Sequence, residues 1–283
     1  MTTLDFAKEA KRIASENNIQ FLLPVIEKEL LHYEILRVLD ENNFLNDLVF
    51  QGGTCLRLSY GAPRYSEDLD FAGGVDFNSS DLADLKNCLQ NELPEKYAVG
   101  VRVVEPRKED SLVKKWNIRI DTSPMRPDLP SQKISLEIAS VPAYTNEPRA
   151  LIVNYSGISP SFADIILSTE SLEEILADKL EAFVCSNHIR HRDIWDMFWI
   201  IRRPSVDVQL ARELRKKKEI DYGEQDQFAN GIVRATQQLS DIVNGSGFEA
   251  QMRRFLPTDL YERTVARAEW RIAAVSSIQD LYR

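Results

Sequence analysis

Residues 49–72 read VFQGGTCLRLSYGAPRYSEDLDFA, and the fold can be inferred from them. It ends with two aspartates, Asp68 and Asp70, which are separated by a single residue. Residues i and i+2 of a strand point to the same face, so both carboxylates can be directed at one place. Neighbouring carboxylates repel unless a cation neutralises them, and Mg²⁺ is usually held by carboxylates together with substrate phosphates. The doublet therefore indicates a magnesium site that binds a nucleotide.

A glycine turn precedes the doublet. Residues 48–51 are typical of a short apolar strand, and Gly52 and Gly53 of a turn that lets the backbone approach a ligand. Thr54 has the side chain of an N-cap residue for a helix over residues 55–60. Because a helix N-terminus presents free N–H groups and a partial positive charge, we expect this turn to bind a triphosphate.

Two blocks of the sequence together resemble a known family. The first contains Gly52-Gly53-Thr54, Arg64, Ser66 and Asp68-Leu69-Asp70. The second contains Lys179 and then Arg190-His191-Arg192-Asp193, with Asp196 three residues later. In this order, over residues 30–200, they resemble the nucleotidyltransferase-like AbiEii/AbiGii toxins, which include the MenT toxins and belong to the DNA polymerase β superfamily.

The resemblance implies an activity and a set of site residues. It implies transfer of a nucleotide from an NTP to an acceptor hydroxyl, with two Mg²⁺ ions, and for MenT-like members the acceptor is the 3′ end of tRNA. It also implies that the chain is the toxin of a toxin–antitoxin or phage-defence system, with a separate antitoxin protein. It assigns metal binding to Asp68 and Asp70 and a catalytic role to these two and Lys179. The nucleotide-binding residues it implies are Gly52, Gly53, Thr54, Arg64, Ser66, Lys179, Arg192, Asp193 and Asp196.

Polymerase β-like sites generally use a third carboxylate from a neighbouring strand. Residues 133–139 alternate between polar and apolar side chains, which predicts a strand with Glu137 on its polar face. We therefore expect Glu137 to be the third catalytic and metal-binding carboxylate, although a solvated acid on a half-buried strand would give the same pattern. Asp121, which ends a second alternating stretch, is the reserve candidate.

The second block allows two interpretations. Lys179 lies beside the apolar stripe of a helix predicted from Leu172 to Phe183, so it is either a solvated lysine or, by resemblance, a triphosphate contact. Asp193 and Asp196 are three residues apart and therefore face one way on the next helix. They either pair with Lys179 or Arg192 as structural partners, or orient the nucleotide and acceptor.

Composition limits the protein's class. The chain has 283 residues, 43% of them hydrophobic, without an apolar run long enough for a membrane span or a signal-peptide pattern, so we expect a cytoplasmic protein that has no membrane partner. The net charge of −9 argues against a protein that coats nucleic acid. Five basic residues nevertheless crowd into residues 212–218, where a solvated helix face is the default and contacts to RNA phosphates are the alternative. The three cysteines, Cys55, Cys88 and Cys185, are expected to be buried free thiols.

The order of the predicted elements gives an α+β fold. Residues 1–160 are expected to form a polymerase β-like nucleotidyltransferase core with a mixed sheet and N-terminal helices, and residues 161–283 a helical domain that completes the nucleotide cleft. Strands are predicted over residues 48–51, 68–72, 97–104, 113–121 and 133–139. Helices are predicted over residues 6–17, 25–40, 81–93, 171–187, 190–201, 208–218, 225–243, 247–255 and 258–275.

Two alternative functions remain open at this point. The same core could transfer a nucleotide to a small molecule of the aminoglycoside kind, or to a protein. The chain could also be a partner-binding module that keeps the fold without turnover. Against the module, a fold freed from catalysis has no physical need to keep two repelling carboxylates together.

Overall fold

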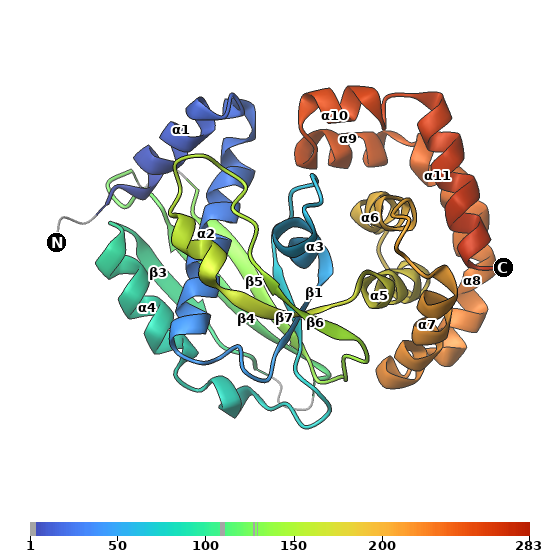
Figure 1. The fold of residues 1–283 in the computed structure, drawn as a ribbon, viewed down its shortest axis with the longest axis horizontal. Helices are drawn as coiled ribbons and strands as arrows, with labels where there is room; N and C mark the ends of the chain where they lie inside the picture. The colour runs from blue at the N-terminus through green and yellow to red at the C-terminus, as the bar shows by residue number, and fades with distance from the viewer. Residues whose placement is uncertain (1–3, 108–110, 127, 129) are drawn as a thin grey trace. The chain divides into compact units, whose positions relative to one another are not determined.

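The structure is a computed structural model that describes residues 4–107, 111–126, 128 and 130–283. The chain forms two compact units, Met1–Thr169 and Glu170–Arg283. In Figure 1 the first unit runs from blue to yellow-green and the second from yellow to red. The units are taken in turn below.

The first unit combines helices with one sheet. Its helices are α1 (Phe6–Glu16), α2 (Leu23–Glu41), α3 (Gly52–Tyr60) and α4 (Leu85–Lys96). Its strands are β1 (Val49–Gln51), β2 (Leu69–Ala72), β3 (Gly100–Val104), β4 (Val113–Asp121), β5 (Gln132–Ala139), β6 (Asn146–Ala150) and β7 (Ile166–Glu170), the last of which ends one residue into the second unit. Short 3-10 turns cover Gln20–Leu22, Ser79–Leu82 and Pro160–Asp164.

The strands pair in the order β3-β4-β5-β2-β1-β7-β6. β2 runs parallel to β5 and antiparallel to β1, while β3, β4 and β5 form an antiparallel meander. β1 also runs parallel to β7. The sheet is therefore mixed, as the sequence predicted, and the chain segment that carries the aspartates lies at its centre.

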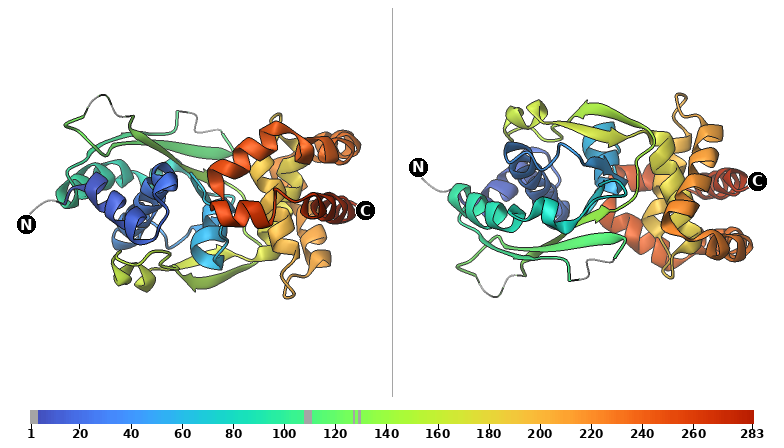
Figure 2. Two further views of the ribbon diagram at one scale, coloured as in Figure 1. Left: turned by 90° about the horizontal axis from the view of Figure 1, so that it is seen from above. Right: turned by 90° about the horizontal axis from the view of Figure 1, so that it is seen from below.

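The two faces of the sheet differ over β3, β4 and β5. Ile134, Leu136 and Ile138 on β5 are buried and alternate with more accessible polar residues, which is the pattern predicted for this strand. β4 alternates in the same way, with Trp116 and Ile118 buried. Figure 2 shows the blue and teal helices α1, α2 and α4 on one side of these green strands. The apolar face thus packs against helices, and the polar face carries Glu137.

Two strands were missed by the sequence analysis, which expected only helices after residue 160 and no strand near residue 148. β6 contains Pro148 and is largely exposed, and it forms the edge of the sheet. Proline is tolerated there because an edge strand needs only one row of hydrogen bonds. β7 is five residues long and carries Ser168 and Thr169, so it lacks a clear apolar alternation. Pairing with β1, rather than local pattern, makes it a strand.

Beyond the end of β7, the second unit is helical throughout the part that the structure describes. Its helices are α5 (Leu172–Cys185), α6 (His191–Ile201), α7 (Val208–Tyr222), α8 (Gln225–Asn244), α9 (Ser246–Phe255), α10 (Thr258–Arg263) and α11 (Ala268–Leu281). The single helix predicted over residues 258–275 is wrong. The chain leaves helical geometry at Thr264, whose hydroxyl donates a hydrogen bond to the Leu260 carbonyl. Val265 is fully buried at this break, so tertiary packing overrides local helix propensity.

Among the described residues, none of the helices combines the length and the apolar character that crossing a bilayer requires. The three cysteines are free thiols. Cys55 and Cys185 are buried as expected, whereas Cys88 is only half-buried.

Candidate active site

Gly52 begins α3 in a backbone conformation that other residues rarely adopt. Its φ is +76°, and a Cβ atom at this position would lie 2.5 Å from Oδ2 of Asp70. A side chain would therefore be strained and would collide with the carboxylate. The turn after β1 thus holds the Asp70 carboxylate against the first residue of α3.

The side chains of Arg64 and Ser66 approach the backbone closely at Gly53. A Cβ atom there would lie 2.6 Å from Nη2 of Arg64 and 2.8 Å from Oγ of Ser66. The Arg64 side chain is buried and also donates a hydrogen bond to the carbonyl of Tyr65. The first N–H groups of a helix have no partner within the helix. A guanidinium, a hydroxyl and the start of α3 therefore lie together, which is a suitable combination for an anion.

The prediction that Thr54 caps the helix is wrong. α3 begins at Gly52 and Gln51 is its N-cap residue, so Thr54 lies inside the first turn. Since Gly52 makes the turn with its positive φ, the helix starts before Thr54 is reached. The buried Thr54 hydroxyl donates a hydrogen bond to the carbonyl of Asp68. Thr54 thereby ties the glycine turn to the aspartate doublet.

Asp70 and Glu137 lie side by side. They are direct partners in the parallel pairing of β2 with β5, and neighbouring strands lie about 4.8 Å apart with partner side chains on one face. Asp68 precedes β2, and its Oδ1 accepts a hydrogen bond of 3.1 Å from the amide of Ser135 on β5. The sheet thus places Asp70 beside Glu137, the residue predicted to be the third carboxylate, and ties Asp68 to the same strand.

Lys115 belongs to the same group, although the sequence analysis did not select it. It is the partner of Glu137 on β4, and its Nζ lies 2.6 Å from Oε1 of that residue. Burial lowers the pKa of Lys115, but the hydrogen bond with Glu137 and the charges of Glu137, Asp68 and Asp70 raise the pKa further, above its ordinary value. The three carboxylates therefore stabilise positive charge next to them. A single sequence carries no signal for this contact because it depends on the register between β4 and β5.

Asp121, the reserve candidate, lies elsewhere. It is at the far end of β4 from Lys115, opposite Gly100 of β3. Six residues of strand span about 20 Å. Its carboxylate accepts a hydrogen bond from the amide of Ser123. Glu137 is therefore the only one of the two candidates that lies beside Asp70.

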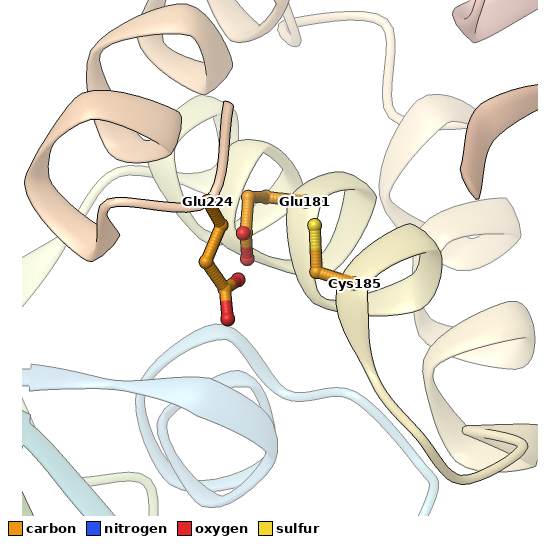
Figure 3. Close-up of side chains that lie close together, drawn as sticks. All are labelled: Glu181, Cys185 and Glu224. Atoms are coloured by element: carbon orange, nitrogen blue, oxygen red, sulfur yellow. The ribbon is translucent and has the colours of Figure 1, made fainter. Parts of the chain in front are cut away.

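The second unit contains a compact acidic cluster that the sequence analysis did not anticipate. Among the described residues, only Glu181, Cys185 and Glu224 form a trio whose ligand atoms all lie within 4.8 Å of one another. Figure 3 shows the three side chains, two from α5 and one from the segment before α8. Burial, followed by the neighbouring Glu224 carboxyl, raises the pKa of Glu181 to about 9, and burial raises the pKa of the Cys185 thiol. Glu181 and the Cys185 thiol therefore favour their protonated forms at neutral pH.

Lys179 is buried and is not the solvated lysine of one interpretation. Its Nζ lies 2.8 Å from Oδ1 of Asp193 and 2.8 Å from Oδ2 of Asp196. Burial by itself raises the pKa of Asp193, but the charges of Lys179 and Arg190 lower it well below its usual range. The structural pairing of Lys179 with both aspartates is therefore present in the second unit. Whether these groups also bind a nucleotide remains a prediction.

Arg192, in the same unit, is half-buried. Its guanidinium is 5.0 Å from the ring centre of Phe255. With Arg190 and Asp193 it also lines an open pocket of about 240 Å³. Residues that the resemblance selected as nucleotide ligands therefore border one depression.

The basic run on α7 is largely structural. Lys218 is fully buried, with Nζ 2.8 Å from Oε1 of Glu174 and 3.1 Å from Oε1 of Glu170. Arg215 forms an ion pair with Glu219 one turn later. Arg212 donates hydrogen bonds to two carbonyls at the end of α11. Three of the five charges that could have met RNA phosphates thus already have partners inside the unit.

Known proteins resemble this chain in sequence and in overall fold. The sequence model of the family described as "Nucleotidyl transferase AbiEii toxin, Type IV TA system" matches residues 34–275. MenT4, a nucleotidyltransferase toxin from Mycobacterium tuberculosis, has a similar structure, with a TM-score of 0.61, 18% identity, and coverage of 98% of this chain and 89% of that one. A putative nucleotidyltransferase from H. pylori has a TM-score of 0.53, 20% identity, and coverage of 90% and 95%. No curated protein matches. At these identities the structural likeness establishes the fold, and it confirms the predicted α+β nucleotidyltransferase architecture.

Proposed function

The chain belongs to the AbiEii nucleotidyltransferase toxin family, and on that premise we propose that it transfers NMP from an NTP to an acceptor hydroxyl, that of the 3′ end of a tRNA. The observation that carries the proposal is the pairing of Asp70 with Glu137, next to the glycine turn that begins α3. Carboxylates beside a helix N-terminus can hold the metal and the phosphates of one nucleotide.

Asp68, Asp70 and Glu137 would hold two Mg²⁺ ions. Their oxygen-only donor set is the one that Mg²⁺ prefers, and the raised pKa of Lys115 supports the fit because the same carboxylates stabilise a positive charge. When bound, the ions supply two effects: they make the acceptor hydroxyl more acidic and they neutralise the departing pyrophosphate. The chain itself would contribute these carboxylates, of which Asp70 and Glu137 are direct strand partners.

The triphosphate would lie at the start of α3. Gly52 and Gly53 let the ligand approach the backbone, and the buried Arg64 and the hydroxyl of Ser66 adjoin that point. Free N–H groups and a guanidinium both favour phosphate oxygens. Thr54 acts as a positioning residue, since its hydroxyl holds the carbonyl of Asp68.

The transfer itself needs no covalent intermediate. The acceptor hydroxyl oxygen attacks the α-phosphorus in line, a new P–O bond forms, and the bond from the α-phosphorus to the bridging oxygen of the β-phosphate breaks. Pyrophosphate leaves with that electron pair, and the hydroxyl proton passes to solvent. Catalysis then rests on positioning and on charge stabilisation, and a rigid sheet can supply both.

In the second unit we assign nucleotide contacts to Lys179, Arg192, Asp193 and Asp196 by family resemblance. Lys179, Asp193 and Asp196 form the buried ion-pair group, and Arg192 borders the pocket of about 240 Å³. Lys179 would contact phosphate, while the two aspartates hold its ammonium in place.

The family's type IV toxin–antitoxin assignment supports a toxin role in growth control or phage defence, with a separate antitoxin protein as partner. Since tRNA and NTP are cytoplasmic, we place the activity in the cytoplasm.

The proposal is tested by incubating the protein with Mg²⁺, total tRNA and each of the four α-labelled NTPs in turn, followed by a denaturing gel. Asp70→Asn is the inactive variant. Asp76→Asn is its matched control because Asp76 is exposed and lies soon after β2. Label on tRNA with wild type and Asp76→Asn, but not with Asp70→Asn, supports the proposal and identifies the base. NTP binding without any labelled tRNA contradicts the acceptor, and the absence of NTP binding contradicts catalysis.

A further inference from the structure

Three basic residues lie in one row across the exposed face of the sheet. Arg102 on β3 is the direct partner of Arg119 on β4, which is the direct partner of Lys133 on β5. All three side chains are exposed. We call these three residues the basic row.

Like charges directly opposite each other in a sheet are unfavourable. In the part of the chain that the structure describes, no hydrogen bond or ion pair connects any member of the basic row to an acidic residue. The three side chains cannot move to the other face of the sheet, because the adjacent row, Val103, Ile118 and Ile134, is buried there. The sheet thus holds three positive charges together, and none of the described residues supplies an acidic partner for them.

The basic row shares a face with the carboxylates. Lys133 precedes Glu137 by four residues on β5, which corresponds to about 13 Å along the strand. Ser135 and Asn117, which are direct partners and uncharged, occupy the position between them. A bound linear polymer whose end lies at Asp70 and Glu137 can therefore extend over Ser135 and Asn117 to the three cations.

We propose that the basic row binds the sugar–phosphate backbone of the acceptor RNA and guides its 3′ end to the carboxylates; this rests on the proposed function. A linear polyanion fits the observations best because the cations form a single row that leads away from the site. Arginine favours phosphate through paired hydrogen bonds. With a net charge of −9, the protein repels nucleic acid in general, so a local row of cations selects where RNA can lie.

The size of the effect follows from counterion release. Each phosphate contact on a single strand contributes about 0.7 to the slope of log K against log salt. Loss of three contacts should reduce that slope by about 2 and weaken RNA binding about ten- to hundredfold near 0.1 M salt. NTP binding should be unchanged, because the row lies about 13 Å from the carboxylates.

The test compares Arg102→Gln/Arg119→Gln/Lys133→Gln with a control that removes three exposed charges elsewhere, Lys8→Gln/Lys11→Gln/Arg234→Gln. Binding of fluorescent tRNA is measured across a salt series, NTP binding separately, and label transfer last. A weaker, less salt-dependent tRNA complex with normal NTP binding in the first variant alone supports the proposal.

A second variant keeps the proposal testable if the triple variant is damaged. Arg119→Glu places an acid between Arg102 and Lys133, so it should raise the melting temperature through two new cross-strand pairs while it weakens tRNA binding. If wild type labels tRNA and both variants bind it as the control does, the basic row is not the RNA surface although the proposed function stands. If the variants keep normal tRNA binding but no longer bind an acidic protein that wild type binds, the basic row is the docking surface of that protein and the proposal is wrong. If wild type neither binds nor labels tRNA, the proposed function itself fails.

Discussion

Two features favour a glycine at the start of α3: its positive φ and the close approach of Asp70. Replacement of Gly52 by alanine tests whether the second has a catalytic consequence. The new Cβ would lie 2.5 Å from Oδ2 of Asp70, whereas ordinary contact begins at 3.4 Å. Cβ and Cγ of Asp70 are each 3.1 Å away, so rotation of the side chain brings only partial relief. The carboxylate must therefore retreat by nearly 1 Å, and it leaves the position opposite Glu137.

Two magnitudes follow. The left-handed backbone costs a side-chain-bearing residue about 1–2 kcal/mol, which corresponds to a fall in melting temperature of about 2–8 °C for a unit of this size. A displacement of about 1 Å in a catalytic group costs about 10²-fold in rate. Gly52→Ala should thus remain folded, with a small loss of stability and a large loss of nucleotidyl transfer.

Gly74→Ala is the matched control. Gly74 has a φ of +80°, close to that of Gly52, but an added Cβ would meet nothing within 4 Å. It should lose about the same 1–2 kcal/mol of stability and keep its activity.

The assay combines thermal unfolding with initial rates of label transfer to tRNA at saturating NTP. Equal rates in the two alanine variants would refute the reasoning, because the collision with Asp70 would then have no catalytic consequence. Unfolding of Gly52→Ala alone would also contradict it, since the backbone penalty is shared.

Three further predictions concern charge. Lys218→Met leaves Glu170 and Glu174 buried without their cation, so the free energy of unfolding in denaturant at pH 7.5 should fall by about 3–5 kcal/mol. Lys216→Met, at an exposed position, should change it little, and equal midpoints for the two variants would contradict the role of the buried pairs. The pKa of Glu181 is raised from 4.5 to about 9, so its contribution to stability is complete below pH 4.5 and is lost as the pH rises through 9. Glu181→Gln should therefore gain stability relative to wild type between pH 6 and pH 9, and a difference in urea midpoints that stays constant over this range would contradict this pH dependence. Lys115→Met removes an ammonium that competes with metal for Glu137, so Mn²⁺ should bind more tightly by calorimetry, and weaker binding would mean that Lys115 supports the metal instead.

The candidate site illustrates how far local sequence carries a prediction. The doublet, the glycine turn and the alternating strand around Glu137 are short-range patterns, and each specifies its own backbone geometry. Thr54 was misassigned because the positive φ of Gly52 sets where the helix starts. The residue types alone do not show that Gly52 adopts this conformation. β6 was missed because Pro148 lowers strand propensity, although an edge strand accepts it.

Contacts between distant segments were beyond local pattern. Lys115 meets Glu137, and the basic row forms, only because β4 pairs with β5 and β3 in one register. A shift of one residue would move every side chain of a strand to the opposite face. The basic run on α7 gives the converse case, since Lys218 belongs to a buried ion-pair group that its neighbours in sequence do not reveal.

Motifs and residue spacing were enough to identify the fold class and the family, and to select Asp68, Asp70 and Glu137 as candidate site carboxylates, because spacing dictates which side chains share a face. Strand pairing, by contrast, places Asp70 and Lys115 on either side of Glu137 and lines up the basic row on the exposed face of the sheet. The physical reason is that charge interactions depend on distance and burial, and strand pairing and helix packing set both.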